Sequence, residues 1–261
     1  MKTDSSEILI ASTILGLWLM ASPGARDAEA GGSGDALSEV GGTALLYEDD
    51  FAGDLSQWVV EQMPGGTTEV RDGRLEIDDA KGCTVWFREK LSGPLLIEFE
   101  ATMIAEGGKH DRVSDLNCFW MAIDPEHPED LFADEARGGS FKNYHALRLY
   151  YVGYGANNNT TTRFRRYPGD GSRPNLPEHD LRDERFRHRG NETVKIQIIV
   201  DGRTIRYLRD GEIVFDFEDR EPYTEGWFGF RTVRNRMRID DFRVYRLLPV
   251  EDEAMDEGAG G

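Results

Sequence analysis

The sequence predicts an all-β fold, a two-sheet antiparallel β-sandwich of the jelly-roll type. Three observations lead to this prediction. No window between Ala44 and Leu248 shows a sustained helical period. Short runs of aromatic and β-branched residues occur instead, many of them alternating with polar residues and bounded by Gly, Pro, Asp or Asn. About a dozen such runs follow one another at the spacing of a sandwich, without the strand–helix alternation of a parallel sheet.

The predicted strands are the runs with this composition. They cover Arg74–Asp78, Cys83–Phe87, Leu95–Thr102, Leu116–Ile123, His145–Tyr154, Thr161–Tyr167, Thr193–Val200, Thr204–Leu208, Glu212–Phe217, Gly226–Arg231 and Met237–Leu247. Asp201-Gly202 and Asp210-Gly211 separate alternating runs, and Asp-Gly in that position is the strongest short signal for a β-hairpin. A meander is therefore expected near the C-terminal end. The loops 125–136 and 175–186 are expected to hold short helices.

The two ends of the chain are expected to lie outside the domain. Ile8–Ala21 is almost wholly apolar and has the length of the central region of a secretory signal, so residues 1–30 are expected to be cleaved after Ala30. Residues 31–43 have the composition of a flexible linker, 44–248 form the jelly-roll domain, and 249–261 form a disordered acidic tail. The protein is therefore expected to be secreted or periplasmic, with no stable membrane span once the signal is removed. An uncleaved anchor is the alternative, and it also places the domain outside the cytoplasm.

The charge balance is strongly acidic. The net charge is −18 and the sequence pI is near 4.7. Nucleic-acid binding needs clustered Lys and Arg to neutralise phosphates, so no nucleic acid is expected as a partner. Hydrophobic residues make up 39% of the chain and aromatic residues 10%, which is enough for a packed core.

The two cysteines do not form a disulfide scaffold. Cys83 and Cys118 both lie in apolar runs, and this leaves two interpretations open: free buried thiols, or a single disulfide in an oxidising compartment. No Cys/His spacing resembles a zinc site. No cofactor is expected. A structural Ca²⁺ is compatible with the many Asp residues, although no EF-hand-like loop supports it.

A first candidate site is the polar segment before the strand Leu116–Ile123. It contains His110, Asp111, Arg112, Asp115 and Asn117. Polar side chains that enter a core strand need partners when they are buried, or they face a ligand. The alternative is a satisfied turn network, in which the two aspartates cap backbone amides and Arg112 pairs with one of them.

A second candidate site lies around the strand Thr161–Tyr167. Period two puts Phe164 on one face and Arg163, Arg165 and Tyr167 on the other. If Phe164 points to the core, two arginines and a tyrosine share the opposite face, and in an acidic protein this indicates an anionic ligand. The alternative is a solvated strand face whose arginines pair with local acids.

Tyr, Asn and Arg are the residue types that a sugar site uses. Aromatic faces stack on the C–H patches of a pyranose, Asn offers both donor and acceptor to hydroxyls, and Arg binds a carboxylate with two parallel hydrogen bonds. Further candidates with these properties, in and beside the second segment, are His145, Tyr151, Tyr154, Asn157 and Asn158. Arg231 and Asn235, which follow an apolar run, are candidates for the mouth of a groove.

The stretch Tyr47–Leu247 resembles a bacterial family of concanavalin-like jelly-roll proteins known as uncharacterised domains, and it is similar to the YesU-like proteins of rhamnogalacturonan utilisation. The pieces that carry the resemblance are Asp49–Trp58, Gly82–Trp86, Asp111–Trp120, Tyr154–Arg163 and Gly226–Thr232. The resemblance implies a galectin- or laminarinase-like sandwich and a polysaccharide or oligosaccharide as partner. It supplies no set of catalytic residues.

Three functions are compatible with these features. The first is a polysaccharide lyase that cleaves a uronic-acid-containing glycan by β-elimination. In that hypothesis Arg163 or Arg165 neutralises the carboxylate, His145 or His110 is the base, and Tyr151 or Tyr154 is the acid. The second is a non-catalytic carbohydrate-binding domain. The third is a glycoside hydrolase, which needs two facing carboxylates; Glu98 and Glu100 alternate on one strand face.

Overall fold

The computed structural model describes residues 42–133 and 137–249. The predicted signal segment, most of the linker and the tail from residue 250 lie outside the described residues. β1 begins at Gly42, so two residues of the expected linker belong to the first strand. No helix in the described part of the chain is long and apolar enough to cross a membrane.

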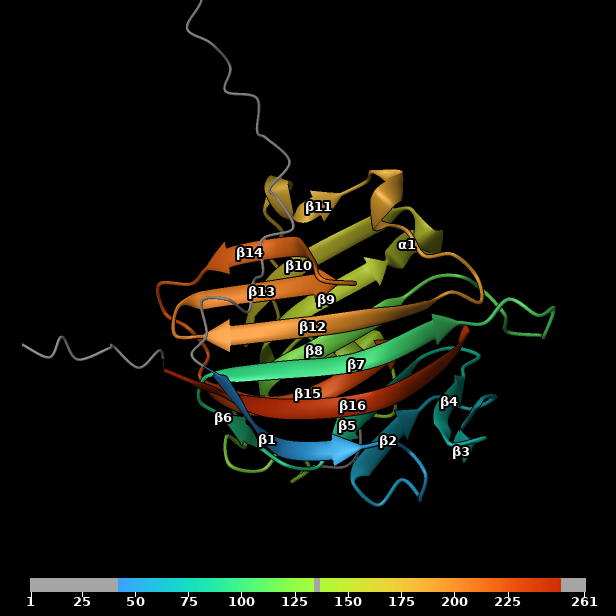
Figure 1. Ribbon diagram of the computed structural model, residues 1–261, viewed down its shortest axis with the longest axis horizontal. Helices are drawn as coiled ribbons and strands as arrows, with labels where there is room; N and C mark the ends of the chain where they lie inside the picture. The colour runs from blue at the N-terminus through green and yellow to red at the C-terminus, as the bar shows by residue number, and fades with distance from the viewer. Residues whose placement is uncertain (1–41, 134–136, 250–261) are drawn as a thin grey trace, which may run out of the picture. The chain divides into compact units, whose positions relative to one another are not determined.

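Two antiparallel sheets form the domain, and this confirms the predicted β-sandwich. One sheet, called the site sheet because the candidate site described below lies on it, runs in the order β11-β10-β9-β8-β15-β5-β2, with β6 paired to β15. The opposite sheet runs β14-β13-β12-β7-β16-β4-β3, with β1 paired to β16. In Figure 1, β12, β7 and β16 lie in front of β9, β8 and β15.

The strands of the site sheet are β2 (Trp58–Gln62), β5 (Cys83–Phe87), β6 (Leu91–Ser92), β8 (Leu116–Ile123), β9 (Arg148–Gly155), β10 (Thr161–Pro168), β11 (Asp180–Leu181) and β15 (Glu225–Thr232). Those of the opposite sheet are β1 (Gly42–Asp49), β3 (Thr67–Arg71), β4 (Arg74–Asp78), β7 (Leu95–Met103), β12 (Thr193–Asp201), β13 (Thr204–Arg209), β14 (Glu212–Glu218) and β16 (Arg236–Leu248).

The predicted meander is present as β12-β13-β14. Both hairpins turn at Asp-Gly, and Gly202, Asp210 and Gly211 have the positive φ values that such turns require. Several strands lie outside the predicted set, namely β1, β2, β3, β6 and β11. They are short or they pair at the margins of the sheets, where the alternation is weak.

The expected short helices are partly wrong. The loop 175–186 holds two 3₁₀ turns, η2 (Pro177–His179) and η3 (Glu184–Phe186), whereas residues 125–133 form turns and a bridge without a helix. β9 begins at Arg148 rather than at His145, because the 3₁₀ turn η1 (Phe141–Tyr144) precedes it.

The inner core lies between the two sheets and is rich in aromatic rings. Trp58 contacts Phe230 and Phe242 at ring-centroid distances of 5.2 and 4.9 Å, and its indole Nε1 donates to Asp49 Oδ2 at 2.8 Å. Cys83 and Cys118 are free and buried in this core. Burial raises the pKa of the Cys83 thiol to about 12, so it remains a thiol at neutral pH.

The site sheet is covered on both faces. All five residues of β5 are buried, although only Cys83, Val85 and Phe87 face the inner core. Trp86 belongs instead to an outer cluster on the far face of the sheet. The other buried members of this outer cluster are Phe119, Ala122, Ile123, Leu131, Tyr144, Leu147, Leu149, Tyr151, Tyr167 and Trp227. The segment between β8 and β9 supplies several of them and covers part of this face.

The buried carboxylate of Glu61, on β2, anchors that covering segment. Its Oε2 accepts hydrogen bonds from Trp86 Nε1 at 3.1 Å and from Tyr144 Oη at 2.6 Å. Its Oε1 accepts from the Arg137 backbone N–H at 3.3 Å and pairs with the Arg137 guanidinium at 3.1 Å. Because every oxygen has charge-assisted partners, the carboxylate fixes Arg137 and Tyr144 on either side of Phe141.

We expect Glu61→Gln to lower the free energy of unfolding by about 3 kcal/mol, because an amide cannot accept all of these bonds and Arg137 keeps only the more distant carboxylate of Asp124, at 3.9 Å. Urea denaturation of the two proteins measures this difference. Glu69→Gln is the matched control: Glu69 pairs with Arg71 at the surface and should contribute less than about 0.5 kcal/mol. Equal losses in the two variants would contradict the anchoring role.

Candidate functional site

A cavity of about 510 Å³ opens on the outer face of the site sheet, beside the covering segment. Its floor comes from alternating residues of the central strands. On β9, Tyr150, Val152 and Tyr154 face the inner core, while Tyr151 and Gly153 line the cavity. A side chain at Gly153 would collide with the Tyr151 hydroxyl, so the glycine leaves the space that the tyrosine ring occupies.

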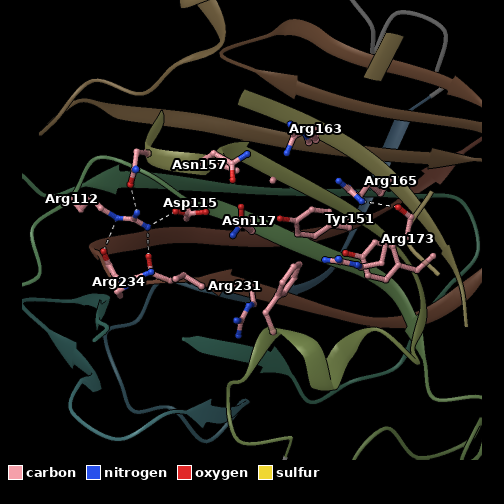
Figure 2. Close-up of a pocket in the computed structure, with 16 residues that line it drawn as sticks. Arg112, Asp115, Asn117, Tyr151, Asn157, Arg163, Arg165, Arg173, Arg231 and Arg234 are labelled. Carbon is pink, nitrogen blue, oxygen red and sulfur yellow. Dashed lines mark hydrogen bonds and ion pairs between the residues drawn. The ribbon is translucent and has the colours of Figure 1, made fainter. Parts of the chain in front are cut away.

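The strand β10 shows the predicted alternation. Phe164 packs in the inner core, and Arg163, Arg165 and Tyr167 line the cavity. Figure 2 shows Arg165 and Arg173 at one end of the cavity and Arg112 and Arg234 at the other, with Tyr151 and Asn117 between them.

Arginine dominates the lining, and the site is called the arginine cavity from here on. Its described lining holds six arginines, at positions 112, 163, 165, 173, 231 and 234, and one carboxylate, Asp115. The whole chain carries a net charge of −18, so this local excess of positive charge opposes the average composition. A cavity of one sign concentrates ligands of the other sign.

Two of these arginines are already neutralised within the protein. Arg163 Nε lies 2.7 Å from Asp180 Oδ1. Arg112 forms an ion pair with Asp115, and its guanidinium also donates to Asn158 Oδ1 at 2.6 Å and to the Arg234 carbonyl at 2.9 Å. Burial raises the pKa of Asp115, although the hydrogen bond from Ser114 and the Arg112 charge oppose this rise.

Arg165, Arg173, Arg231 and the exposed Arg234 form no ion pair with any described residue. Arg165 Nη1 donates to the Arg173 carbonyl at 2.7 Å, and the Arg173 guanidinium lies 5.6 Å from the centre of the Phe141 ring. Arg231 is only 1% exposed. Its Nη1 donates to Thr84 Oγ1 and the Gly139 carbonyl at 3.1 and 2.6 Å, but its Nε and Nη2 have no partner. A buried guanidinium with unused donors is costly unless an anion meets it.

The charges of Arg165 and Arg231 act on two tyrosines of the floor, Tyr151 and Tyr167, and that of Arg173 acts on Tyr167. Burial raises the pKa of Tyr151 and that of Tyr167, the latter to about 12, and the nearby arginines oppose both shifts. Both phenols therefore stay protonated at neutral pH. The buried Tyr167 hydroxyl makes no hydrogen bond of good geometry, although the Arg173 guanidinium lies close enough to lower its pKa, and the Tyr151 hydroxyl forms no hydrogen bond with a described residue.

His145 lies at the end of the cavity, outside its immediate lining. Its ring is 6.5 Å from that of Tyr167 and 5.2 Å from that of Phe141, and its buried Nε2 has no partner. Burial lowers the pKa of His145 below 6.5, and the charges of Arg173, Arg165 and Arg231 lower it further. The imidazole is therefore neutral at pH 7 and able to accept a proton.

Asparagines form one rim of the cavity in the turn α1 (Ala156–Asn159). Asn157, Asn158 and Asn159 all have positive φ, at 54°, 59° and 59°, and Asn tolerates this left-handed conformation better than most residues. Asn159 fixes the turn, since its side chain bonds the backbone N–H and C=O of His188 at 2.9 Å each. Asn157 and Asn158 line the cavity, and backbone geometry thus explains part of the Asn-Asn-Asn motif.

Four of the sequence-predicted residues lie away from the arginine cavity. His110 Nδ1 is 2.5 Å from Asp78 Oδ1, and Asp111 accepts from the Glu106 and Gly108 amides at 2.6 and 2.9 Å. Asp111 and the Arg112–Asp115 pair thus find their partners within the protein, as expected for a satisfied turn network. Tyr154 and Asn235 point into the protein interior: Tyr154 packs in the inner core and accepts from Arg209 at 3.1 Å, and Asn235 is fully buried.

The sequence reasoning did not find Phe141, Arg173 or Arg234, which also line the cavity. Phe141 lies in a 3₁₀ turn and the two arginines in loops, so no periodicity marks them. Conversely, Glu98 lies on the outer face of the opposite sheet and pairs with Lys195 at 2.9 Å. The described lining of the arginine cavity does not contain the two facing carboxylates that glycoside hydrolysis requires.

No group of three or more His, Cys, Asp or Glu side chains among residues 42–133 and 137–249 is arranged to hold a metal ion. The residues of the arginine cavity are suited to binding an anion that also carries hydroxyl groups. Arginines supply the charge, Asn117, Asn157 and Asn158 supply amides, and Phe141 supplies an aromatic surface.

Solved structures share the fold. A protein of unknown function with a galectin-like fold from Bacillus subtilis superposes with a TM-score of 0.62 and 17% identity, over 79% of this chain and 97% of that chain. The metal-free carbohydrate recognition domain of Emp46p gives a TM-score of 0.50 and 13% identity, over 73% and 88% of the two chains. Carbohydrate binding module CBM66 from Bacillus subtilis gives 0.49 and 12%, over 72% and 94%.

No curated protein matches the sequence. Residues 77–242, well over half of the chain, match the family described as Domain of unknown function (DUF6250). This segment includes β5, β8, β9, β10 and β15, and therefore most of the arginine cavity. The chain belongs to the family of domains of unknown function DUF6250.

Proposed function

We propose that the arginine cavity binds a uronic-acid-containing polysaccharide or oligosaccharide outside the cytoplasm. The observation that carries this proposal is the set of three arginines, Arg165, Arg173 and Arg231, that have no carboxylate partner among the described residues and act on the same floor of the cavity. A carboxylated ligand supplies the missing partner, and charge-assisted hydrogen bonds of this kind contribute about 1.5–3 kcal/mol each.

The remaining lining supports a saccharide rather than a simple anion. Phe141 is half-buried and offers a ring face to the C–H patch of a sugar, and the amides of Asn117, Asn157 and Asn158 match hydroxyl groups. The Oδ1 atom of Asn117 is buried without a partner and is therefore available as an acceptor. The fold is also the one used by the carbohydrate recognition domain of Emp46p. The similarity to YesU-like proteins and the export of the domain remain parts of this proposal.

We expect the purified protein to bind oligogalacturonides or glucuronate-containing oligosaccharides and to ignore their neutral counterparts. Arg165→Gln should weaken binding about tenfold, because it removes a charge that no protein carboxylate balances. Isothermal calorimetry measures both affinities. Arg189→Gln alters the net charge equally at an exposed position and should leave the affinity unchanged. Equal affinity for neutral and acidic sugars would exclude the uronate proposal.

A catalytic form of this proposal is β-elimination. Arg165 suits the role of neutralising the carboxylate better than Arg163, because Asp180 already balances Arg163. His145 takes the proton from C5, and the electrons of the broken C5–H bond form the C4–C5 double bond. The C4–O bond then breaks, and Tyr151 protonates the leaving oxygen. The raised pKa of Tyr151 keeps this acid protonated, and the lowered pKa of His145 keeps this base neutral. His110 and Tyr154 lie away from the cavity. This assignment therefore uses His145 rather than His110 as the base and Tyr151 rather than Tyr154 as the acid.

If the protein is a lyase, uronate polysaccharides should yield an unsaturated product that absorbs in the ultraviolet. Tyr151→Phe should lower kcat by about 10²–10⁴-fold while calorimetric binding is retained, because it removes only the hydroxyl. The acid side of the pH–rate profile should lie below pH 6.5, since the pKa of His145 is lowered and the base is neutral above it. A flat absorbance trace with intact binding would leave a non-catalytic binding domain as the function.

A further inference from the structure

A second, smaller cavity of about 190 Å³ adjoins the arginine cavity at the edge of the sandwich. Its walls are apolar and come from β10, β14 and the segment that contains η2. Phe164, Phe217, Leu176, His179, Pro168 and Pro174 line it, together with Arg165 and Arg166. This apolar cavity shares only Arg165 with the lining of the arginine cavity and differs from it in polarity.

The apolar cavity is open because the edge of β10 has no strand partner there. β11 pairs only with Thr162 and Arg163, so the edge of β10 from Phe164 onward is not covered by a strand. Leu176 stands at the entrance and is 44% exposed. A large apolar side chain at such an opening remains in contact with water unless a ligand covers it.

Besides Arg165 and Arg166, one polar ring lines this cavity. The His179 ring lies 5.1 Å from the Phe164 ring and 5.5 Å from the Phe217 ring, and burial lowers its pKa, with the Glu178 charge opposing. Its imidazole forms no hydrogen bond with a described residue. The site therefore presents a neutral imidazole that can bind one carbonyl or hydroxyl within an otherwise apolar surface.

The two cavities share a wall. The Arg165 side chain lines both, and Arg173 lines the arginine cavity while Pro174, the next residue, lines the apolar cavity. The bond from Arg165 Nη1 to the Arg173 carbonyl, at 2.7 Å, fixes this wall. A ligand whose carboxylate meets Arg165 thus has the apolar cavity directly beside it. Arg166, also in the lining, is occupied by Asp219 at 2.7 Å.

We propose that the apolar cavity is a subsite for an aromatic or acyl substituent carried by the acidic saccharide in the arginine cavity. This inference rests on the proposed function and names its substrate class more narrowly, as a uronate bearing an aryl or ester group. An apolar cavity of about 150 Å³ accommodates benzene, so the size fits one ring. The His179 imidazole then meets the ester carbonyl or the phenolic hydroxyl of the substituent.

The test compares 4-nitrophenyl and methyl glycosides of glucuronic and galacturonic acid by calorimetry on the full chain. The aryl glycoside should bind about tenfold more tightly than its methyl counterpart, through burial of the ring. Leu176→Ser should reduce this ratio to about two or less without changing the affinity for the methyl glycoside. Ile213→Ser is the matched control, since Ile213 is equally exposed on β14 but lines neither cavity, and it should preserve the ratio.

Each remaining outcome overturns a different statement. If aryl and methyl glycosides bind equally, or if Leu176→Ser leaves their ratio intact, the subsite is refuted while the proposed function stands. If neither glycoside and no uronate oligosaccharide binds, the proposed function fails and the subsite fails with it. If Leu176→Ser instead converts an oligomer into a monomer in sedimentation, the apolar surface is a contact between two copies of the chain and the subsite is refuted.

Discussion

Burial of the site sheet on both faces is the constraint on which the arrangement of this site depends. In an ordinary two-sheet sandwich the outer face of each sheet meets water, and its side chains are free to reorient. Here the outer cluster around Trp86 and Tyr167 packs on that face, so several residues directed outward from β8, β9 and β10 are buried, among them Phe119, Tyr151 and Tyr167. The arginine cavity lies where the covering segment leaves this outer face open.

Glu61 connects this packing to the chemistry of the site. Its carboxylate holds Arg137 and Tyr144, and Phe141 and the Gly139 carbonyl lie between these two anchors. The Gly139 carbonyl in turn accepts from Arg231, and Phe141 lies beside the guanidinium of Arg173. A buried acid on one edge strand therefore positions two of the unpaired arginines, although it does not itself line the cavity.

The contrast between paired and unpaired arginines carries more information than their number. Arg112 and Arg163 shape the cavity as internal ion pairs, and their charges are largely cancelled within the protein. Arg231 is buried with unused hydrogen-bond donors, and burying a charge in this way costs free energy of folding. Packing around Phe141 and Tyr144 and hydrogen bonds to Thr84 and Gly139 maintain it. Unsatisfied donors of this kind are typical of binding sites rather than of cores.

The sequence by itself determined the fold class, the meander and the face on which Arg163, Arg165 and Tyr167 lie, because period-two alternation and Asp-Gly turns are local properties of the chain. The same periodicity places Tyr154 in the core beside Tyr150 and Val152, on the face of β9 opposite to the arginine cavity. The tertiary structure alone decided that Asp180 neutralises Arg163, that Arg231 is buried without a carboxylate partner, and that loop residues Phe141 and Arg173 complete the cavity. These outcomes depend on contacts between segments far apart in the chain, and no local pattern encodes which acid meets which arginine.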